Sequence, residues 1–175
     1  MSNPKVELHV TNYGVITLEL DAEKAPKSTA NFVNYVKKGH YDGTVFHRVI
    51  DNFMIQGGGY DTRYAQKPTR APIPHEGAEA LAAGGPRNTV GTIAMARTMD
   101  PNSASAQFFI NVKDNAFLDH TAPTARGYGY VAFGKVVSGM DIVNRIKAVP
   151  TGPGGPFPSD VPKTPVVITS ATLVK

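Results

Sequence analysis

The sequence predicts a mainly β fold, a closed antiparallel β-barrel capped by two α-helices. Many short segments alternate apolar and polar residues, which is the pattern of strands with one buried face. Only two separate stretches place apolar residues at helical spacing. No internal repeat, heptad pattern or linker divides the chain, so we expect residues 1–175 to form a single domain.

The N-terminal part of the chain predicts a β-hairpin followed by a helix. Apolar and polar residues alternate at 6–10 and again at 16–20, and the intervening Asn12-Tyr13-Gly14 suits a turn. The helix is expected to begin at Pro26, a residue suited to the first helical position, and to stop at Gly39.

Further strands are predicted along the rest of the chain, at 44–50, 53–57, 90–96, 107–112, 130–137 and 166–173. The second helix is expected to begin at Ser138-Gly139-Met140-Asp141, a sequence close to a capping box. Residues 57–88 are rich in Gly, Pro and Ala, which predicts a long irregular loop, and long ordered loops are often functional. A second Pro/Gly-rich stretch, 150–165, is expected to connect the second helix to the last strand.

The composition excludes several classes of protein. Without any cysteine, the chain cannot use thiol catalysis, cysteine metal sites or disulfides. The segment MSNPKVELHV lacks the features of a signal peptide, and no apolar run approaches membrane-spanning length, so we expect a cytoplasmic protein without a membrane partner. The net charge of +4 comes from scattered basic residues, and therefore no nucleic-acid partner is expected.

The motifs of common catalytic and cofactor sites are missing from the sequence. Gly57-Gly58-Gly59 makes a poor phosphate loop, because neither a Lys-Ser/Thr pair nor a helical start follows it. The five histidines have no metal-ligand spacing, and Ser103 and Ser105 lack the context of a nucleophile elbow. We therefore expect no cofactor, no metal and no nucleophilic hydrolysis.

One charged residue interrupts the apolar stretch FHRVIDNFMIQGGG, residues 46–59. Burying the charge of Arg48 without a partner would be costly, because arginine stays protonated at ordinary pH. Its guanidinium group is therefore expected to face a partner or a substrate.

Two of the predicted strands combine an amide with a large apolar side chain on one face. Strand alternation places Met54 with Gln56, opposite Phe53, and likewise places Gln107 with Phe109. An apolar surface with a few amides and an arginine suits an uncharged, amide-rich ligand such as an extended peptide. The alternative is that Gln56 and Gln107 simply end strands at the surface.

Four segments in consistent order carry a resemblance to a known family: FHRVIDNFMIQGGG, GTIAMAR, SAQFFINVKDNAFLD and YVAFGKVVSGMDIV. Together they resemble the cyclophilins, the cyclosporin-binding class of peptidyl-prolyl cis–trans isomerases, and in particular the short bacterial cytoplasmic type. The resemblance spans roughly residues 5–173. It implies an eight-stranded antiparallel barrel closed by two helices, which agrees with the pattern of elements above.

The resemblance also implies a set of site residues. Arg48 matches the catalytic arginine of the family. The residues implied to bind the substrate are Phe53, Met54, Gln56, Ala96, Arg97, Gln107, Phe109, Phe117, Leu118 and Tyr130. For each of these the alternative role is packing in the core.

The chain departs from the family pattern at three positions. Asp51 stands where proline is frequent, in a turn that suits aspartate. Arg97 stands where many relatives have asparagine, and Phe117 replaces the tryptophan of many eukaryotic members. Because phenylalanine has no N–H donor, the last departure predicts that cyclosporin is only a weak ligand.

The activity implied by the resemblance is rotation about X-Pro peptide bonds, with Arg48 stabilising the twisted amide and the apolar residues holding the proline ring. The expected partners are proline-containing peptides and unfolded or folding proteins, and the protein is expected to be a monomer. The alternative is a peptide-binding or chaperone-like module that turns over poorly. Arg48 argues against this alternative, because binding alone would not need a cation at a proline pocket.

Overall fold

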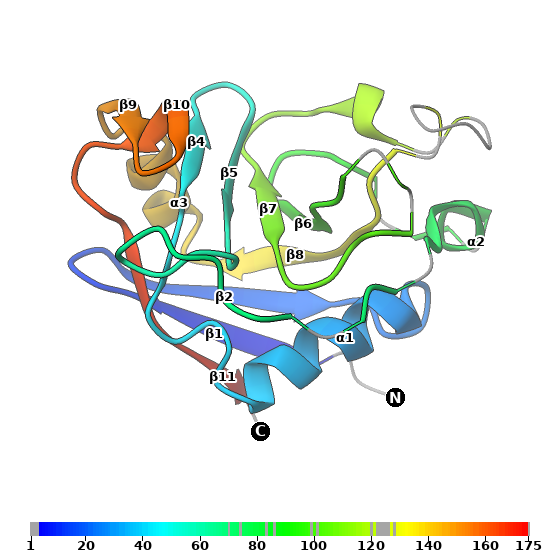
Figure 1. Cartoon of the computed structure of the whole chain (residues 1–175). Helices are drawn as coiled ribbons and strands as arrows, with labels where there is room; N and C mark the ends of the chain where they lie inside the picture. Colours follow the sequence, from blue (N-terminus) through cyan, green and yellow to red (C-terminus); the bar gives the residue numbers. More distant parts are fainter. Residues whose placement is uncertain are drawn as a thin grey trace.

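The computed structural model describes residues 4–69, 71–73, 75–82, 84–85, 87–98, 100, 102–119, 121, 127 and 129–174. Within these ranges strands predominate, and one large antiparallel sheet forms the body of the molecule (Figure 1). Helix α1 (Pro26–Lys37) packs against this sheet through the main core, and a small separate ribbon lies beside one edge of the sheet.

The main sheet of the described residues has nine strands. They are β1 (Lys5–Val10), β2 (Gly14–Leu20), β3 (Thr44–Val45), β4 (Arg48–Ile50), β5 (Met54–Gly57), β6 (Thr92–Met95), β7 (Phe108–Asn111), β8 (Ala132–Ser138) and β11 (Val167–Val174). Their spatial order is β3-β11-β1-β2-β8-β6-β7-β5-β4. The two edge strands, β3 and β4, follow each other directly in the chain, so the sheet is strongly curled. Within the described residues these two strands do not pair with each other, so the expected closure of the barrel is not matched by a complete ladder of strand hydrogen bonds.

The predicted class, a mainly β protein with an antiparallel barrel-like sheet and covering helices, is confirmed. The implied count of eight barrel strands is not matched, because the predicted strand 44–50 is divided at Phe46 and His47. At this point the backbone changes partners: the amide of Val45 donates to the carbonyl of Tyr60, and the amide of Phe46 donates to the carbonyl of Val166. Counting β3 and β4 as one bent strand reduces the nine strands to eight.

Helices α1 (Pro26–Lys37) and α3 (Met140–Lys147) lie where the sequence predicts them. The expected capping box of α3 is wrong: its N-cap is Gly139 at φ 91°, without a side-chain cap. A Cβ atom at this position would collide with the carbonyl oxygen of Val15. The close approach of β2 therefore requires glycine here, and no capping side chain can replace it.

Sequence patterns missed several short elements in the two Pro/Gly-rich stretches. A short helix, α2 (Gly77–Ala82), lies within the long loop after β5, and β9 (Thr151–Gly154) pairs with β10 (Phe157–Pro162) as a two-stranded ribbon. The described residues thus contain three α-helices instead of two, together with a 3-10 turn, η1 (Ala116–Leu118). The ribbon packs beside β4, and its register is interrupted between Phe157 and Val161, which explains why no alternating pattern revealed it.

Strand alternation sends neighbouring residues into two separate apolar clusters. The larger cluster contains Ile55, Ile93 and Phe108 together with Phe32 of α1, whose ring centroid lies 5.5 Å from that of Phe108. The smaller cluster, here called the pocket floor, consists of Met54, Ala94, Phe109, Leu118 and Ala132. Strands β5, β6 and β7 are therefore covered by apolar side chains on both faces.

Replacing Phe32 by alanine is expected to lower the free energy of unfolding by about 3–5 kcal/mol, because the ring is fully buried and its removal leaves a cavity. Phe117→Ala is the matched control, since that ring is 73% exposed, and we expect it to cost less than about 1 kcal/mol. Urea unfolding followed by far-UV circular dichroism measures both. Equal losses for the two variants would contradict the position of Phe32 in the main core.

Candidate active site

A row of side chains crosses four neighbouring strands on the outer face of the sheet. Arg48 of β4 is paired with Gln56 of β5, Gln56 is paired with Phe109 of β7, and Phe109 is paired with Ala94 of β6. Directly opposed residues of antiparallel strands point to the same face. The sheet register therefore brings the cation, the amide and the aromatic ring together.

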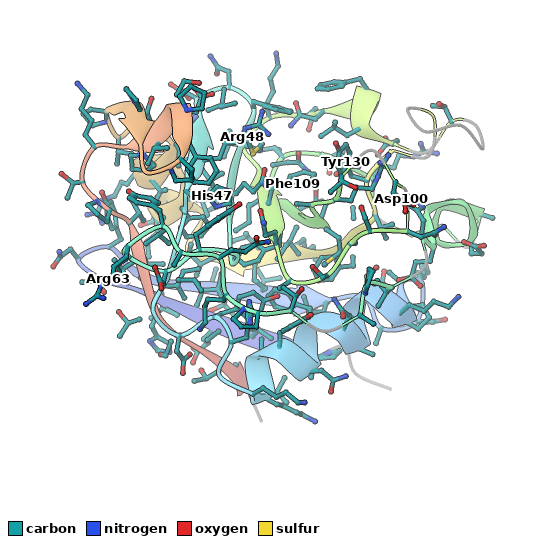
Figure 2. The ribbon with its side chains drawn as sticks, in the orientation of Figure 1. His47, Arg48, Arg63, Asp100, Phe109 and Tyr130 are labelled. Carbon is teal, nitrogen blue, oxygen red and sulfur yellow. The ribbon has the colours of Figure 1, made fainter. Side chains whose placement is uncertain are left out.

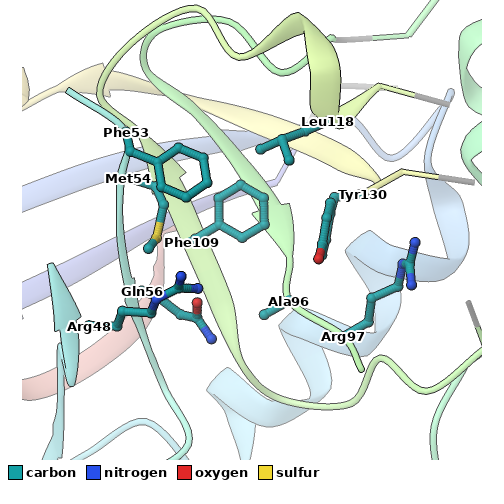
Figure 3. A pocket seen from close by; sticks show the side chains of 9 residues that line it. All are labelled: Arg48, Phe53, Met54, Gln56, Ala96, Arg97, Phe109, Leu118 and Tyr130. Carbon is teal, nitrogen blue, oxygen red and sulfur yellow. The ribbon is translucent and has the colours of Figure 1, made fainter. Parts of the chain in front are cut away.

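A cavity of 110 Å³ lies over this row (Figure 3). Nine of the eleven residues expected at the site line it: Arg48, Phe53, Met54, Gln56, Ala96, Arg97, Phe109, Leu118 and Tyr130. Arg48 and Gln56 stand at one end of this pocket, and Arg97 and Tyr130 stand at the other.

The remaining two expected residues lie just outside the pocket. Gln107 accepts a hydrogen bond from Nε2 of Gln56 through its Oε1 atom, at 3.0 Å. Phe117 stacks on Phe53 with ring centroids 5.8 Å apart and is otherwise exposed to solvent. Gln107 thus supports one wall of the pocket, and Phe117 extends its rim.

The side chain of Arg48 is exposed, whereas its neighbours His47 and Val49 are buried. Among the residues that the structure describes, no acidic group forms an ion pair with Arg48. The charge therefore keeps its hydration in the free protein, and its N–H donors remain available at the edge of an apolar pocket.

The bottom of the pocket is formed by apolar, buried side chains. Met54, Phe109 and Leu118 are each at most 8% exposed, and Phe53 packs against them from the side. The expectation that Phe53 faces away from Met54 is wrong, because β5 begins only at Met54 and strand alternation does not apply to the residue before it.

The opposite end of the pocket is held together by Arg97. Its guanidinium carbon lies 4.8 Å from the centre of the Tyr130 ring, and its Nε atom donates to the carbonyl of Gly129 at 2.8 Å. The Tyr130 ring in turn meets Phe109 edge to face, with centroids 5.5 Å apart. Arg97 thereby fixes Tyr130 against the pocket floor.

A buried network of amides, which the sequence reasoning missed, holds the backbone around the pocket. Asn111 donates to Oδ1 of Asn88 at 3.1 Å and accepts from Nδ2 of Asn115 at 2.8 Å. Asn115 also donates to the carbonyl of Phe53, and Asn88 donates to the carbonyl of Tyr130. The available signal was an asparagine inside the apolar strand sequence FFIN, since asparagine is depleted in strands.

His47 lies beneath the β9–β10 ribbon and is 4% exposed. Its ring packs against Tyr60 and Phe157 with centroid distances of 4.7 and 5.2 Å, and its Nδ1 atom has no hydrogen-bond partner in the described part of the chain. Burial, together with the charge of Arg48, lowers the pKa of His47 from 6.5 to about 4. His47 is therefore neutral at pH 7.

Two structural features are absent from the described residues. No group of three or more His, Asp or Glu side chains is arranged to hold a metal ion there. None of the helices described has the length and apolar character needed to cross a membrane.

A curled antiparallel sheet carries an apolar pocket that is lined by two arginines and a glutamine, with a second glutamine bonded to the first, and this arrangement has the chemistry of a peptide-binding site. Comparison with known proteins identifies the family. The family model for "Cyclophilin type peptidyl-prolyl cis-trans isomerase/CLD" matches residues 5–173.

Individual relatives match over nearly the whole chain. Peptidyl-prolyl cis-trans isomerase cyp18 of Streptomyces antibioticus is 56% identical over 169 residues, which are 97% of this chain and 98% of the relative. Peptidyl-prolyl cis-trans isomerase B of Escherichia coli (strain K12) is 49% identical over 163 residues, 93% and 96% of the two chains. A crystal structure of a Cryptosporidium parvum cyclophilin type peptidyl-prolyl cis-trans isomerase in the presence of the dipeptide Ala-Pro superposes with a TM-score of 0.78 at 25% sequence identity. The superposition covers 98% of this chain and 99% of that chain.

The chain therefore belongs to the cyclophilin-type peptidyl-prolyl cis–trans isomerases, a family of enzymes. The family suggested by the four sequence segments is confirmed.

The low pKa of His47 predicts how stability depends on pH. The unfolded chain binds a proton at His47 below about pH 6.5, whereas the folded chain does so only near pH 4. The free energy of unfolding should therefore fall as the pH is lowered through this window, with a slope for this group approaching about 1.4 kcal/mol per pH unit. His47→Phe keeps a ring in place but cannot titrate, so urea unfolding between pH 4 and 7 should show a smaller loss in the variant. Parallel curves for the two proteins would contradict a buried neutral His47.

Proposed function

We propose that this isomerase accelerates rotation about X-Pro bonds in peptides and folding proteins by stabilising the twisted amide with Arg48. The observation that carries the proposal is the position of Arg48, an exposed cation without an ionic partner among the described residues, at the edge of an apolar pocket.

The chemical problem is the double-bond character of the X-Pro amide. Resonance gives its C–N bond a rotational barrier of about 18–20 kcal/mol. In the twisted state the prolyl nitrogen becomes pyramidal and regains a lone pair, which can accept a hydrogen bond. A guanidinium directed at this nitrogen stabilises the twisted state more than either planar state, and such differential binding is catalysis.

The pocket floor supplies the site for the proline ring. Proline has no N–H group, so its ring is recognised by shape, and the buried side chains of Met54, Phe109 and Leu118 offer an apolar surface for it. One N–H of the Gln56 amide is used by Gln107, which leaves its other N–H and its carbonyl oxygen for the substrate. The Gln56–Gln107 pair thus offers fixed polar contacts beside the ring.

The substrate class is supported by the Cryptosporidium parvum relative, whose structure was determined in the presence of Ala-Pro. By analogy, the substrates of this chain are proline-containing peptides and unfolded or folding proteins. The proposed mechanism uses no proton transfer, no covalent intermediate and no cofactor, because Arg48 acts by charge and hydrogen bonding alone.

Arg48→Ala should lower kcat/KM for a short Ala-Pro peptide by at least about a hundredfold, the usual loss when an electrostatic donor to the transition state is removed. Arg48→Lys should recover little, because an ammonium group lacks the planar fork of guanidinium. A prolyl isomerisation assay measures these effects, and melting temperatures verify that the variants are folded.

The matched control for this experiment is Arg63→Ala. Arg63 is an exposed arginine located away from the pocket (Figure 2), so its loss should leave kcat/KM unchanged. A folded Arg48→Ala enzyme with nearly normal kcat/KM would contradict the electrostatic mechanism. Peptide binding without turnover by the unmodified protein would instead favour a chaperone-like module.

The same pocket is proposed to bind cyclosporin weakly. Where relatives carry a rim tryptophan, its indole N–H can donate to the inhibitor, whereas Phe117 offers a ring without a donor. An unsatisfied buried acceptor costs about 1–3 kcal/mol, so Phe117→Trp should tighten inhibition by about tenfold to a hundredfold. Peptide turnover should be unchanged, because short peptides do not reach the rim. Equal inhibition of both proteins would contradict the rim position of Phe117.

A further inference from the structure

A second and larger cavity, of 410 Å³, adjoins the proline pocket. The two cavities share Arg48 and Gln56, so a peptide that leaves the first at this end passes directly into the second. The outer wall of the second cavity is the β9–β10 ribbon, which packs beside β4 (Figure 1).

Three rings form the apolar part of this second cavity. Tyr60 and Phe157 meet edge to face at 4.9 Å, and His47 packs against both of them. Aromatic faces attract apolar groups, and they also attract planar cations such as guanidinium. His47 adds no positive charge at neutral pH, because burial keeps it unprotonated.

The ribbon contributes one carboxylate to the same cavity. Asp160 accepts a hydrogen bond from the hydroxyl of Ser159 at 3.2 Å and, within the described ranges, forms no ion pair. Its backbone adopts φ 65°, a left-handed conformation that aspartate and asparagine tolerate better than other side chains do. The carboxylate is therefore available to a ligand that carries a positive charge.

We infer that this cavity is a second substrate subsite, which binds a basic side chain, arginine best, on the residue that follows the proline. Guanidinium satisfies both features of the cavity, because it stacks on aromatic rings and pairs with a carboxylate. The inference rests on the proposed function and specifies the substrates that the site prefers.

The second cavity is assigned to the residue after the proline because of which half of the substrate stays still during rotation. When the proline ring is held in its pocket, the residue that follows is attached to the fixed half of the turning bond, so it keeps its place in both isomers. A cavity with fixed walls suits that residue. The residue before the proline then lies at the opposite end of the proline pocket, near Ala96. There the charge of Arg97 disfavours a basic side chain.

The size of the preference is limited by Arg48, which also lines the second cavity and repels a cation. Cation–π contacts and ion pairs at solvent-accessible sites are modest, so we expect KM to be about 3–10-fold lower for arginine than for alanine after the proline. Because the subsite binds the ground state and the twisted state equally, kcat should not change.

The test compares short peptides with Arg, Ala or Glu after a single proline, together with a peptide that carries Arg before it. The inference predicts the lowest KM for Arg after the proline, a higher KM for Ala and the highest for Glu. No gain is expected for Arg before the proline. Isomer exchange measured by NMR gives kcat and KM for each peptide.

Asp160→Asn tests the carboxylate, because asparagine keeps the shape and tolerates the same backbone conformation. This variant should lose the discrimination among Arg, Ala and Glu while turning over the Ala peptide normally. Asp100→Asn is the matched control: it removes the same charge from an exposed loop away from the ribbon (Figure 2) and should keep the full preference.

Three outcomes would overturn the inference: normal turnover of all peptides without a preference for Arg, a preference for Arg before the proline, or an undiminished preference in Asp160→Asn. The comparison of peptides on the unmodified enzyme remains decisive even if the variant does not fold. Absence of turnover with every peptide is a distinguishable result, since it would refute the proposed function as well.

Discussion

Two adjacent phenylalanines on β7 connect the core of this molecule to its pocket. Phe108 points into the main core, where it meets Phe32 and Tyr41, while Phe109 points to the opposite face and forms part of the pocket floor. Because a tightly packed core leaves little freedom to the strands that bound it, the position of the pocket floor is fixed from behind. Arg48 and Gln56 are paired with Phe109 through the sheet register, so their backbone positions are constrained as well.

The charge of Arg48 can remain hydrated until a substrate arrives, because β4 exposes this residue between two buried neighbours. Binding of a peptide over the pocket floor would then remove water from around the guanidinium. Electrostatic interactions strengthen in a less polar environment, so in the proposed mechanism the field of the arginine would be largest when the X-Pro bond lies beside it. In the proposed mechanism, the apolar pocket and the cation at its edge therefore depend on each other.

The sequence predicted the parts of the fold that are specified locally. The first hairpin and α1 follow from alternation and from Pro26, whereas β9 and β10 lie in a Pro/Gly-rich stretch and depend on tertiary contacts such as that of Phe157 with His47. Arg48 and Gln56 were visible as polar residues in apolar strands. The amide network was missed, because Asn88 comes from a separate segment and meets Asn111 and Asn115 only in the fold.

The site, too, consists of two sets of groups with different proposed roles. The groups that would act on the X-Pro bond stand on paired strands, at Arg48, Gln56 and Phe109, and the core behind them leaves little room for variation. The groups proposed to contact the neighbouring residues of the substrate lie outside the main sheet. Arg97 follows β6 and lines one end of the pocket, and Asp160 belongs to β10 of the ribbon and lines the second cavity beyond the other end. In the proposed arrangement, substitutions at either end would therefore change the sequence preference while leaving the geometry around the turning bond the same.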